Sequence, residues 1–164
     1  MIINGRFNVL HELGEGGFGK VFLVDDHETK ELCALKLIKP ELSEIFGLQD
    51  KFRDEATTWM AFGKHPNIVG VRSVDSFNGF FLIALEYVAP GENGVNCLDK
   101  YLENRRVTTR KALTWAIQLC DALTYANKRG MIAHRDLKPS NIMISHDDSI
   151  KLTDFGLSVS AKLF

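Results

Sequence analysis

The sequence predicts an α+β protein built of two lobes, the first rich in strands and the second mainly helical. Up to Val88, apolar stretches of strand length alternate with polar turns and are interrupted by one helical pattern. Beyond a stretch at residues 89–95 that contains glycine and proline, apolar residues recur at helical spacing instead. We therefore expect a first lobe over about residues 1–88, a linker over 89–95 and a second lobe over 96–164.

The first lobe is expected to contain a five-stranded antiparallel sheet and one main helix. Five apolar stretches have strand length, at residues 7–13, 20–26, 31–38, 67–76 and 80–88. The last two flank Asn78-Gly79, a strong hairpin signal. Between the third and fourth strands, a helix is predicted from the spacing of Leu48, Phe52, Glu55, Trp59 and Phe62.

The second lobe is expected to hold two helices and a small hairpin. These elements are predicted over residues 98–103 and 109–128 for the helices, and 142–144 and 150–152 for the hairpin strands. The longer helix carries two apolar stripes on nearly opposite sides, one of Leu113, Ile117, Cys120 and Thr124 and one of Trp115, Leu119, Ala122 and Ala126. A helix that is apolar on both sides normally lies inside a larger core. If the Trp115 stripe stayed in contact with water, a chain of this length would be only marginally stable.

Composition narrows the class of protein. With 45% hydrophobic and 25% charged residues the chain is of globular type, and its net charge of −1 gives no electrostatic reason to expect nucleic acid as a partner. Cys33, Cys97 and Cys120 show no CxxC spacing, so neither a disulfide framework nor a zinc site is indicated. The N-terminus lacks a signal-peptide core, and the longest apolar run, residues 80–85, is too short to cross a bilayer. We expect a cytoplasmic protein without a membrane segment, of unknown oligomeric state.

Residues 14–21 read GEGGFGKV, a glycine-rich stretch of the form G-x-G-x-x-G-x-V. Glycines at this spacing let backbone N–H groups approach phosphate oxygens. A strand pattern follows instead of a helix, and Lys20 is followed by Val21 rather than by Ser or Thr, which argues against a dinucleotide-binding fold and a P-loop. Two interpretations remain: a glycine-rich hairpin over a nucleotide, or a turn that binds no ligand.

Lys36 lies on the same face of its predicted strand as Ala34 and Ile38, so its ammonium group needs a partner among apolar neighbours. Glu55 lies in the middle of the apolar arc of the predicted helix, where a lone carboxylate would carry a large desolvation cost. We therefore expect these two charges to pair. The alternative is a lysine at a strand edge and a half-exposed helix glutamate.

Two polar clusters flank the predicted hairpin: residues 134–141 read HRDLKPSN, and residues 154–156 read DFG. A loop joined to a hairpin can gather Asp136, Asn141 and Asp154 around one point, with oxygen ligands for a hard cation such as Mg²⁺. One carboxylate would then remain to orient a hydroxyl group. Taken singly, each of these acids is also compatible with a simple turn.

Together these motifs resemble those of the eukaryotic-type serine/threonine protein kinase family, from about Arg6 to the last residue. The resemblance rests on the glycine stretch, Ala34-Leu35-Lys36, Glu55, His65-Pro66-Asn67-Ile68-Val69, HRDLKPSN and DFG, in the family's order. Lys138-Pro139 is similar to the serine/threonine branch rather than the tyrosine branch. The resemblance implies a two-lobe kinase fold with a five-stranded first lobe, and ATP and Mg²⁺ as ligands.

The resemblance implies that the nucleotide lies between the lobes. Lys36 would hold the α and β phosphates while paired with Glu55, and the glycine stretch would cover the triphosphate. The covering residues would be Gly14, Glu15, Gly16, Gly17, Phe18 and Gly19. The adenine would lie among Val21, Ala34, Leu85, Glu86, Val88 and Met143.

The resemblance also implies the catalytic groups. Asp136 would accept the proton of the incoming hydroxyl, with Lys138 close to the transferred group. Asn141 and Asp154 would bind Mg²⁺, and Phe155 would pack between the lobes below the helix of Glu55.

In the family, further motifs and large helices follow DFG, so we expect this chain to be the first two-thirds of a kinase domain. Its expected function is ATP-dependent phosphoryl transfer to protein serine or threonine hydroxyls, with the competence of the 164-residue chain left open. The alternative is a non-catalytic ATP-binding or interaction module derived from a kinase domain. A small-molecule phosphotransferase is disfavoured by the complete HRDLKPSN motif. The sequence does not indicate the protein substrate.

Overall fold

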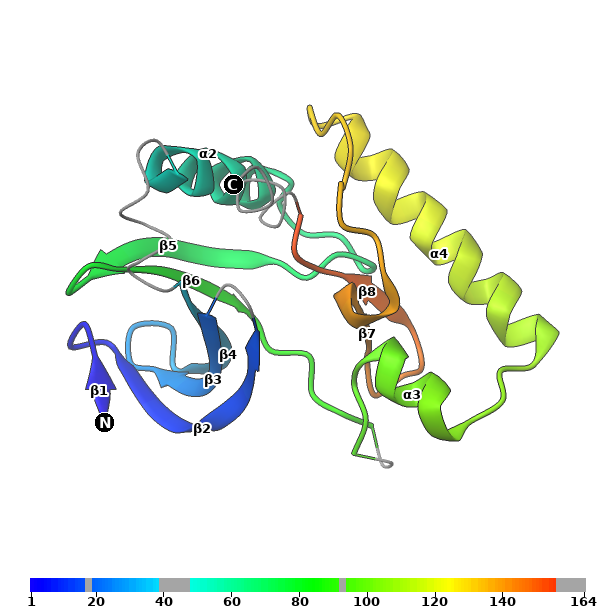
Figure 1. Cartoon of the computed structure of the whole chain (residues 1–164), viewed down its shortest axis with the longest axis horizontal. Helices are drawn as coiled ribbons and strands as arrows, with labels where there is room; N and C mark the ends of the chain where they lie inside the picture. The colour runs from blue at the N-terminus through cyan, green and yellow to red at the C-terminus, as the bar shows by residue number, and fades with distance from the viewer. Residues whose placement is uncertain (17–18, 39–47, 92–93, 156–164) are drawn as a thin grey trace.

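The computed structural model describes residues 1–16, 19–38, 48–91 and 94–155. A curled antiparallel sheet with one helix lying across it is followed by a smaller unit of two helices and a two-stranded sheet (Figure 1). The elements of the first part are β1 (Ile2–Ile3), β2 (Phe7–Gly16), β3 (Gly19–Asp26), β4 (Glu31–Ile38), α2 (Leu48–Ala61), β5 (Val71–Phe77) and β6 (Phe80–Glu86). Those of the second part are α3 (Leu98–Asn104), α4 (Thr109–Asn127), the 3₁₀ turn η1 (Pro139–Asn141), β7 (Ile142–Ile144) and β8 (Ile150–Leu152).

The large sheet has the strand order β1-β2-β3-β4-β6-β5, one strand more than the five that the sequence predicted. The added strand β1 forms a hairpin with β2, in which Ile3 faces Phe7. Asn4 and Gly5 make its turn with φ angles of 51° and 65°. Asn-Gly is the same dipeptide that predicted the second hairpin at Asn78-Gly79, and it acts here for the same reason, because both positions need positive φ.

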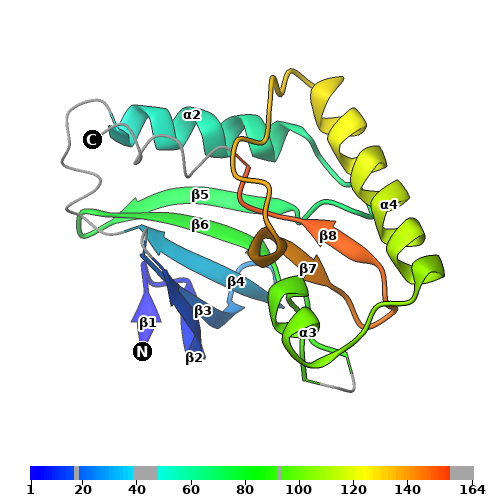
Figure 2. The same cartoon turned by 45° about the vertical axis from the view of Figure 1, so that its right-hand side comes forward.

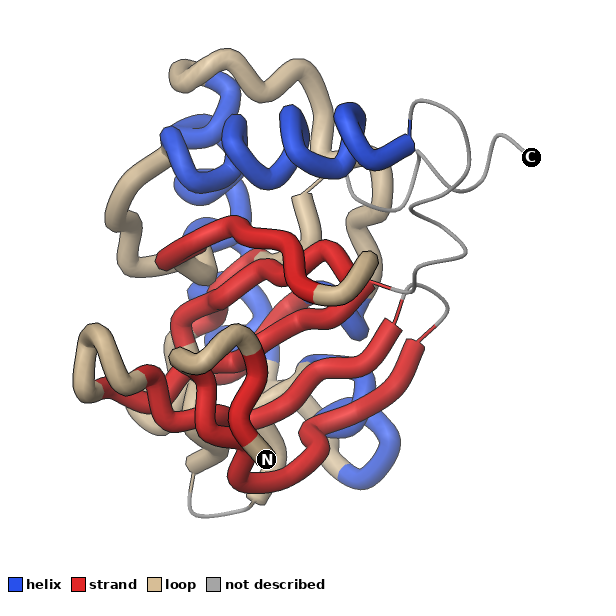
Figure 3. The backbone as a smooth tube through the Cα atoms, turned by 90° about the vertical axis from the view of Figure 1, so that its left-hand side faces the viewer, coloured by secondary structure: helices blue, strands red, loops and turns tan. Residues whose placement is uncertain are grey.

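Alternate residues of the central strands face two different cores. On one face of the sheet, Cys33 and Leu35 of β4 are buried with Phe7 and Val24. On the other face the sheet packs against α2, which lies across it (Figure 3). This alternation is the period of two expected of strands, and it places Ala34 and Lys36 on the side of the sheet that faces the second part.

The fourth predicted strand, observed as β5, starts later than expected, at Val71 instead of Asn67. Residues 67–69 contact β8 of the second part instead of extending β5. The backbone N–H of Leu152 donates to the carbonyl oxygen of Asn67 at 2.9 Å, and that of Val69 donates to the carbonyl oxygen of Leu152 at 2.9 Å. The buried side chain of Asn67 adds a bond from Nδ2 to the carbonyl oxygen of Ile150 at 2.8 Å. These bonds join the two parts of the chain.

In the second part, α4 packs against β8, and α3 packs against β7 and η1 (Figure 2). One apolar stripe of α4 is buried and the other is exposed. Trp115, Ala122 and Ala126 are buried, and the indole N–H of Trp115 donates to the carbonyl oxygen of Asp148 at 2.8 Å. The opposite stripe is the one that meets water, with Leu113 and Ile117 60% and 62% exposed. The β7–β8 hairpin thus covers the stripe that contains Trp115, and the other stripe stays exposed. Within the described residues, no helix is long and apolar enough to cross a membrane.

Candidate active site

A cavity of about 320 Å³, named the front cavity here, lies between the large sheet and the β7–β8 hairpin. Its wall includes many of the predicted nucleotide contacts, namely Gly14, Val21, Ala34, Lys36, Leu85, Glu86, Val88, Met143 and Asp154. The sequence prediction missed Leu13, Val69, Tyr87, Asn96, Cys97, Ser140 and Thr153. Several of these could have been found, because they directly adjoin predicted site residues or the HRDLKPSN and DFG motifs.

The glycine stretch forms the turn end of the β2–β3 hairpin, where Gly14 lies opposite Val21 and Gly16 opposite Gly19. Gly19 is required by close packing, because a Cβ atom there would collide with the carbonyl oxygen of Leu37. A Cβ atom at Gly14 or Gly16 would meet no other atom within 4 Å. Glu15 is paired with Lys20 at 3.5 Å on the outside of the hairpin. Gly17 and Phe18 lie outside the described residues.

Lys36 binds Asp154 across the front cavity, with 2.7 Å between Nζ and Oδ1. The two residues are 118 positions apart and belong to β4 and to the segment after β8. Lys36 itself is buried, which makes a carboxylate partner necessary. The pairing partner differs from the expected one, because the sequence interpretation paired Lys36 with Glu55.

Glu55 is half-buried on α2 and lines a different cavity, of about 180 Å³. Trp59, Arg135 and Phe155 also line that cavity. The expected Lys36–Glu55 pair is therefore replaced in this structure by the Lys36–Asp154 pair. Glu55 lines the other cavity, whereas Asp154 lines the front cavity together with Lys36.

The residues of the HRDLKPSN motif are connected by hydrogen bonds. Nδ2 of Asn141 donates to the carbonyl oxygen of Asp136 at 2.9 Å and to its Oδ2 at 3.0 Å. Nζ of Lys138 lies 2.7 Å from the same Oδ2. The backbone N–H of Thr153 donates to the carbonyl oxygen of Asn141 at 3.0 Å, which places Asp154 next to this network. Asp136 and Asn141 are thus in direct contact, and Asp154 adjoins them through Thr153.

Two non-glycine residues of the predicted site motifs adopt positive φ, namely Arg135 at 66° and Asp154 at 61°. Such backbone is uncommon for residues with a Cβ atom and persists where the surroundings hold it in place. For Asp154 the conformation accompanies the ion pair with Lys36. Gly156, which follows Phe155, lies outside the described residues.

Phe155 is buried between the two parts of the chain, as the resemblance of the motifs implied. Its ring lies 5.4 Å from that of Trp59 and 5.2 Å from that of Phe62, measured between centroids. The ring of His134 lies 4.8 Å away on another side, and Nε2 of His134 is 2.9 Å from the carbonyl oxygen of Thr153. Burial lowers the pKa of His134, so its imidazole is neutral at pH 7. His134 thus supports the loop of Asp136 without adding charge.

The segment between the two parts borders the front cavity at Glu86 and Val88. The backbone N–H of Glu86 donates to the carbonyl oxygen of Gly70 at 2.8 Å. Nδ2 of Asn96 donates to the carbonyl oxygen of Val88 at 2.8 Å. Asn96 therefore fixes the segment from the side of the second part, a role that the sequence prediction did not assign.

The oxygen ligands available for a metal ion are few. Within the described chain, no three His, Cys, Asp or Glu side chains gather closely enough to hold an ion by themselves. The carboxylate of Asp154 and the amide of Asn141 are hard oxygen donors on neighbouring segments. Mg²⁺ characteristically takes one or two protein oxygens and completes its shell with water and substrate phosphates. This donor set therefore fits Mg²⁺ bound together with a nucleotide.

Comparison with known proteins agrees with this geometry. Residues 7–163 match the protein kinase domain family. The chain is 33% identical over 157 residues to a probable serine/threonine-protein kinase of Clostridium acetobutylicum, covering 96% of this chain and 23% of that protein. It is 36% identical over 154 residues to CBL-interacting serine/threonine-protein kinase 3 of Arabidopsis thaliana, covering 94% of this chain and 34% of the relative.

The fold matches that of solved kinase domains. The kinase domain of PknI from Mycobacterium tuberculosis superposes with a TM-score of 0.81 at 27% identity, over 96% of this chain and 61% of that one. The chain thus spans a quarter to a third of the curated relatives and less than two-thirds of the PknI domain. From its sequence match, its fold and the motifs around the front cavity, the chain belongs to the protein kinase family.

Proposed function

We propose that this chain binds Mg-ATP in the front cavity and carries the groups that transfer its γ-phosphoryl group to serine or threonine hydroxyls of proteins. One observation carries the proposal: Lys36 pairs with Asp154 at the front cavity, and the backbone of the adjacent Thr153 bonds to Asn141, whose side chain bonds to Asp136. Because a triphosphate is highly charged, a site for it needs a buried cation and hard oxygen ligands together. The similarity to serine/threonine kinases supports the choice of acceptor.

The buried ammonium of Lys36 would bind phosphate oxygens, and its bond to Asp154 supports a position next to a proposed metal ligand. Mg²⁺, held by Asp154 and Asn141 when bound, would neutralise the charge that develops on the phosphates. The adenine would contact Ala34 and Met143.

Asp136 is suited to accept the proton of the attacking hydroxyl. Its Oδ2 is oriented by Asn141 and Lys138, so the carboxylate cannot turn away. The hydroxyl oxygen forms the new bond to the γ-phosphorus, the bond from that phosphorus to the bridging oxygen breaks, and ADP leaves. The side chain of Lys138 is half-exposed and can follow the charge to the transferred group.

The position of Glu55 favours a second candidate, a non-catalytic ATP-binding module. In kinases the pairing of the corresponding glutamate with the lysine accompanies catalysis, and here Lys36 pairs with Asp154 instead.

We also propose a cytoplasmic location, supported by the free thiols of Cys33, Cys97 and Cys120, which suit a reducing compartment.

The test is transfer of labelled γ-phosphate from ATP to a mixture of serine- and threonine-containing peptides. We expect Asp136→Asn to lower the rate by about 10²- to 10⁴-fold, the usual contribution of a positioned base. The exposed Asp121→Asn serves as the matched control and should leave the rate unchanged. Mg-ATP binding with a wild-type rate no higher than that of Asp136→Asn would contradict catalysis and favour the module.

A further inference from the structure

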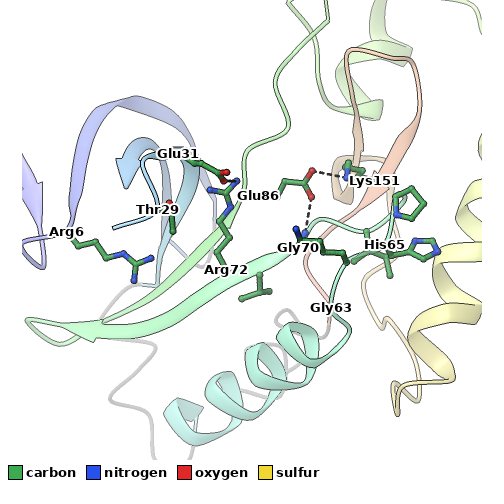
Figure 4. A pocket seen from close by; sticks show the side chains of 13 residues that line it. Arg6, Thr29, Glu31, Gly63, His65, Gly70, Arg72, Glu86 and Lys151 are labelled. Atoms are coloured by element: carbon green, nitrogen blue, oxygen red, sulfur yellow. Dashed lines mark hydrogen bonds and ion pairs between the residues drawn. The ribbon is translucent and has the colours of Figure 1, made fainter. Parts of the chain in front are cut away.

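A second cavity, of about 780 Å³, borders the other side of the segment at Glu86, and we name it the rear cavity (Figure 4). Glu86 lines both cavities. The charged groups on the rear wall are Arg6, Lys64, Arg72, Lys151, Glu31 and Glu86, so cations outnumber carboxylates. None of these cations has a part in the proposed phosphoryl transfer.

The cations of the rear cavity differ in how firmly they are held. Arg6 is bound by Asp26 through two bonds, of 2.7 and 2.6 Å, and Lys151 lies 2.8 Å from Glu86. Arg72 Nη2 lies 2.9 Å from Glu31, whose side chain is 64% exposed. An ion pair with such an exposed carboxylate is weak and easily exchanged.

Arg72 also has an unused donor. Its Nη1 is buried without a hydrogen-bond partner, and it is the one side-chain nitrogen or oxygen in the described chain of which this is true. A buried donor without an acceptor carries a desolvation cost that an incoming anion would relieve. If the guanidinium turns from Glu31 toward the cavity, both of its terminal nitrogens can bind one anion side by side, the geometry that carboxylate and phosphate groups match.

The rest of the wall contains apolar groups. Pro66, Ile68 and Val71 line the same cavity, and Ile68 is buried. Lys64 lies nearby and pairs with no carboxylate in the described part of the chain, so it is available to a second oxygen of the ligand. A volume of this size is within the range of small-molecule sites, about 300 to 1,000 Å³.

We propose that the rear cavity is a second ligand site, for a small organic anion with a carboxylate or phosphate group on an apolar body. Arg72 is its principal anion-binding residue, and Lys64 contributes a second positive charge. The site is separate from the nucleotide site of the front cavity. This proposal can therefore be tested independently of the proposed kinase activity.

The test is calorimetric titration of the chain with benzoate and with phenyl phosphate, compared with neutral benzamide. We expect the anions to bind and benzamide to bind at least about tenfold more weakly, because one charge-assisted hydrogen-bonded pair accounts for about that factor. Of the two anions, the tighter one identifies the preferred group. Arg72→Gln should weaken anion binding by about tenfold and Lys64→Gln by about threefold. The exposed Arg106→Gln is the matched control and should change nothing.

Saturating Mg-ATP separates the two sites. The anion should still bind when the front cavity is occupied, and it should bind even if the chain proves unable to bind ATP. Displacement of the anion by Mg-ATP would overturn the proposal, since the anion would then occupy the front cavity. The proposal would also be overturned if benzamide bound as tightly as the anions. The same holds if the Arg72→Gln and Lys64→Gln variants bound the anions as tightly as wild type.

Discussion

The front and rear cavities share Glu86 but hold their ion pairs in different surroundings. In the front cavity, the side chains of Lys36 and Asp154 are 9% and 27% exposed. In the rear cavity, those of Arg72 and Glu31 are 26% and 64% exposed. A buried pair loses more when one partner is removed, because the remaining charge cannot be solvated, whereas an exposed pair is compensated by water.

This difference separates two kinds of charge placement. In the front cavity, breaking the Lys36–Asp154 pair leaves a buried charge without a partner and is costly. In the rear cavity, the Arg72–Glu31 pair can be exchanged at little cost. The Lys151–Glu86 pair is less exposed, and Arg6 is the exception, since its partner Asp26 is completely buried.

The largest expected effect is at that exception. The bonds from Arg6 hold the pKa of Asp26 well below its usual range, as do the backbone N–H of Glu28 and the hydroxyl of Thr29. A lowered carboxyl pKa stabilises the folded state above the unfolded value of about 4, and this stability is lost as the pH falls toward the folded value. We expect Asp26→Asn to lower the free energy of unfolding by about 3 kcal/mol at pH 7.

Denaturant unfolding at pH 7, 5, 3 and 2 measures this effect. The difference between wild type and Asp26→Asn should shrink steadily below pH 4, because Asp26 becomes protonated in the unfolded state while it stays charged in the folded state. The carboxyls of Asp99 and Asp147 also have lowered pKa values, but they are present in both proteins and cancel. A difference that stays constant across this range would refute the assigned cause.

The next largest effect is the difference in unfolding free energy between breaking an ion pair in the front cavity and breaking one in the rear cavity. We expect Asp154→Ala to lower the free energy of unfolding by about 2 kcal/mol, since it leaves the buried ammonium of Lys36 without its partner. Glu31→Ala should cost less than about 0.5 kcal/mol, because the pair that it breaks is exposed. Equal costs in urea unfolding at pH 7 would remove the distinction between the cavities.

A smaller effect concerns thiol reactivity in the front cavity. Burial raises the pKa of Cys97 to about 12, and its Sγ contacts the carbonyl oxygen of Ser140 at 3.3 Å. Cys120 is exposed on α4. Since the thiolate is the reactive form, iodoacetamide at pH 8 should modify Cys120 at least about tenfold faster than Cys97. Peptide mass spectrometry over a time course measures both rates, and comparable rates would contradict the burial of Cys97.

Much of the fold was predictable from local patterns. The strands of residues 20–26 and 31–38, the helix beginning at Leu48 and the β7–β8 hairpin follow from apolar periodicity, which reflects burial on one face. The segment at residues 67–69 was misassigned to a strand because its backbone partners belong to β8, more than 80 residues away. Local sequence carries no information about such a partner.

The candidate site shows the same limit. The residues of the glycine stretch, of HRDLKPSN and of DFG were identifiable because their chemistry requires fixed spacing along the chain. The actual partner of Lys36 was not, because Asp154 lies 118 positions away along the chain. The rear cavity had no sequence signal at all, since Arg72, Glu86 and Lys151 come from three separate segments.

The most direct test of the central claim is a calorimetric titration of the chain with Mg-ATP. The claim is that the buried charges of the front cavity bind a metal-bound triphosphate. Lys36→Ala should weaken Mg-ATP binding by at least about tenfold, while Lys100→Ala, which removes an exposed lysine of α3, should leave the Kd unchanged. Equal Kd values for wild type and Lys36→Ala would contradict the claim.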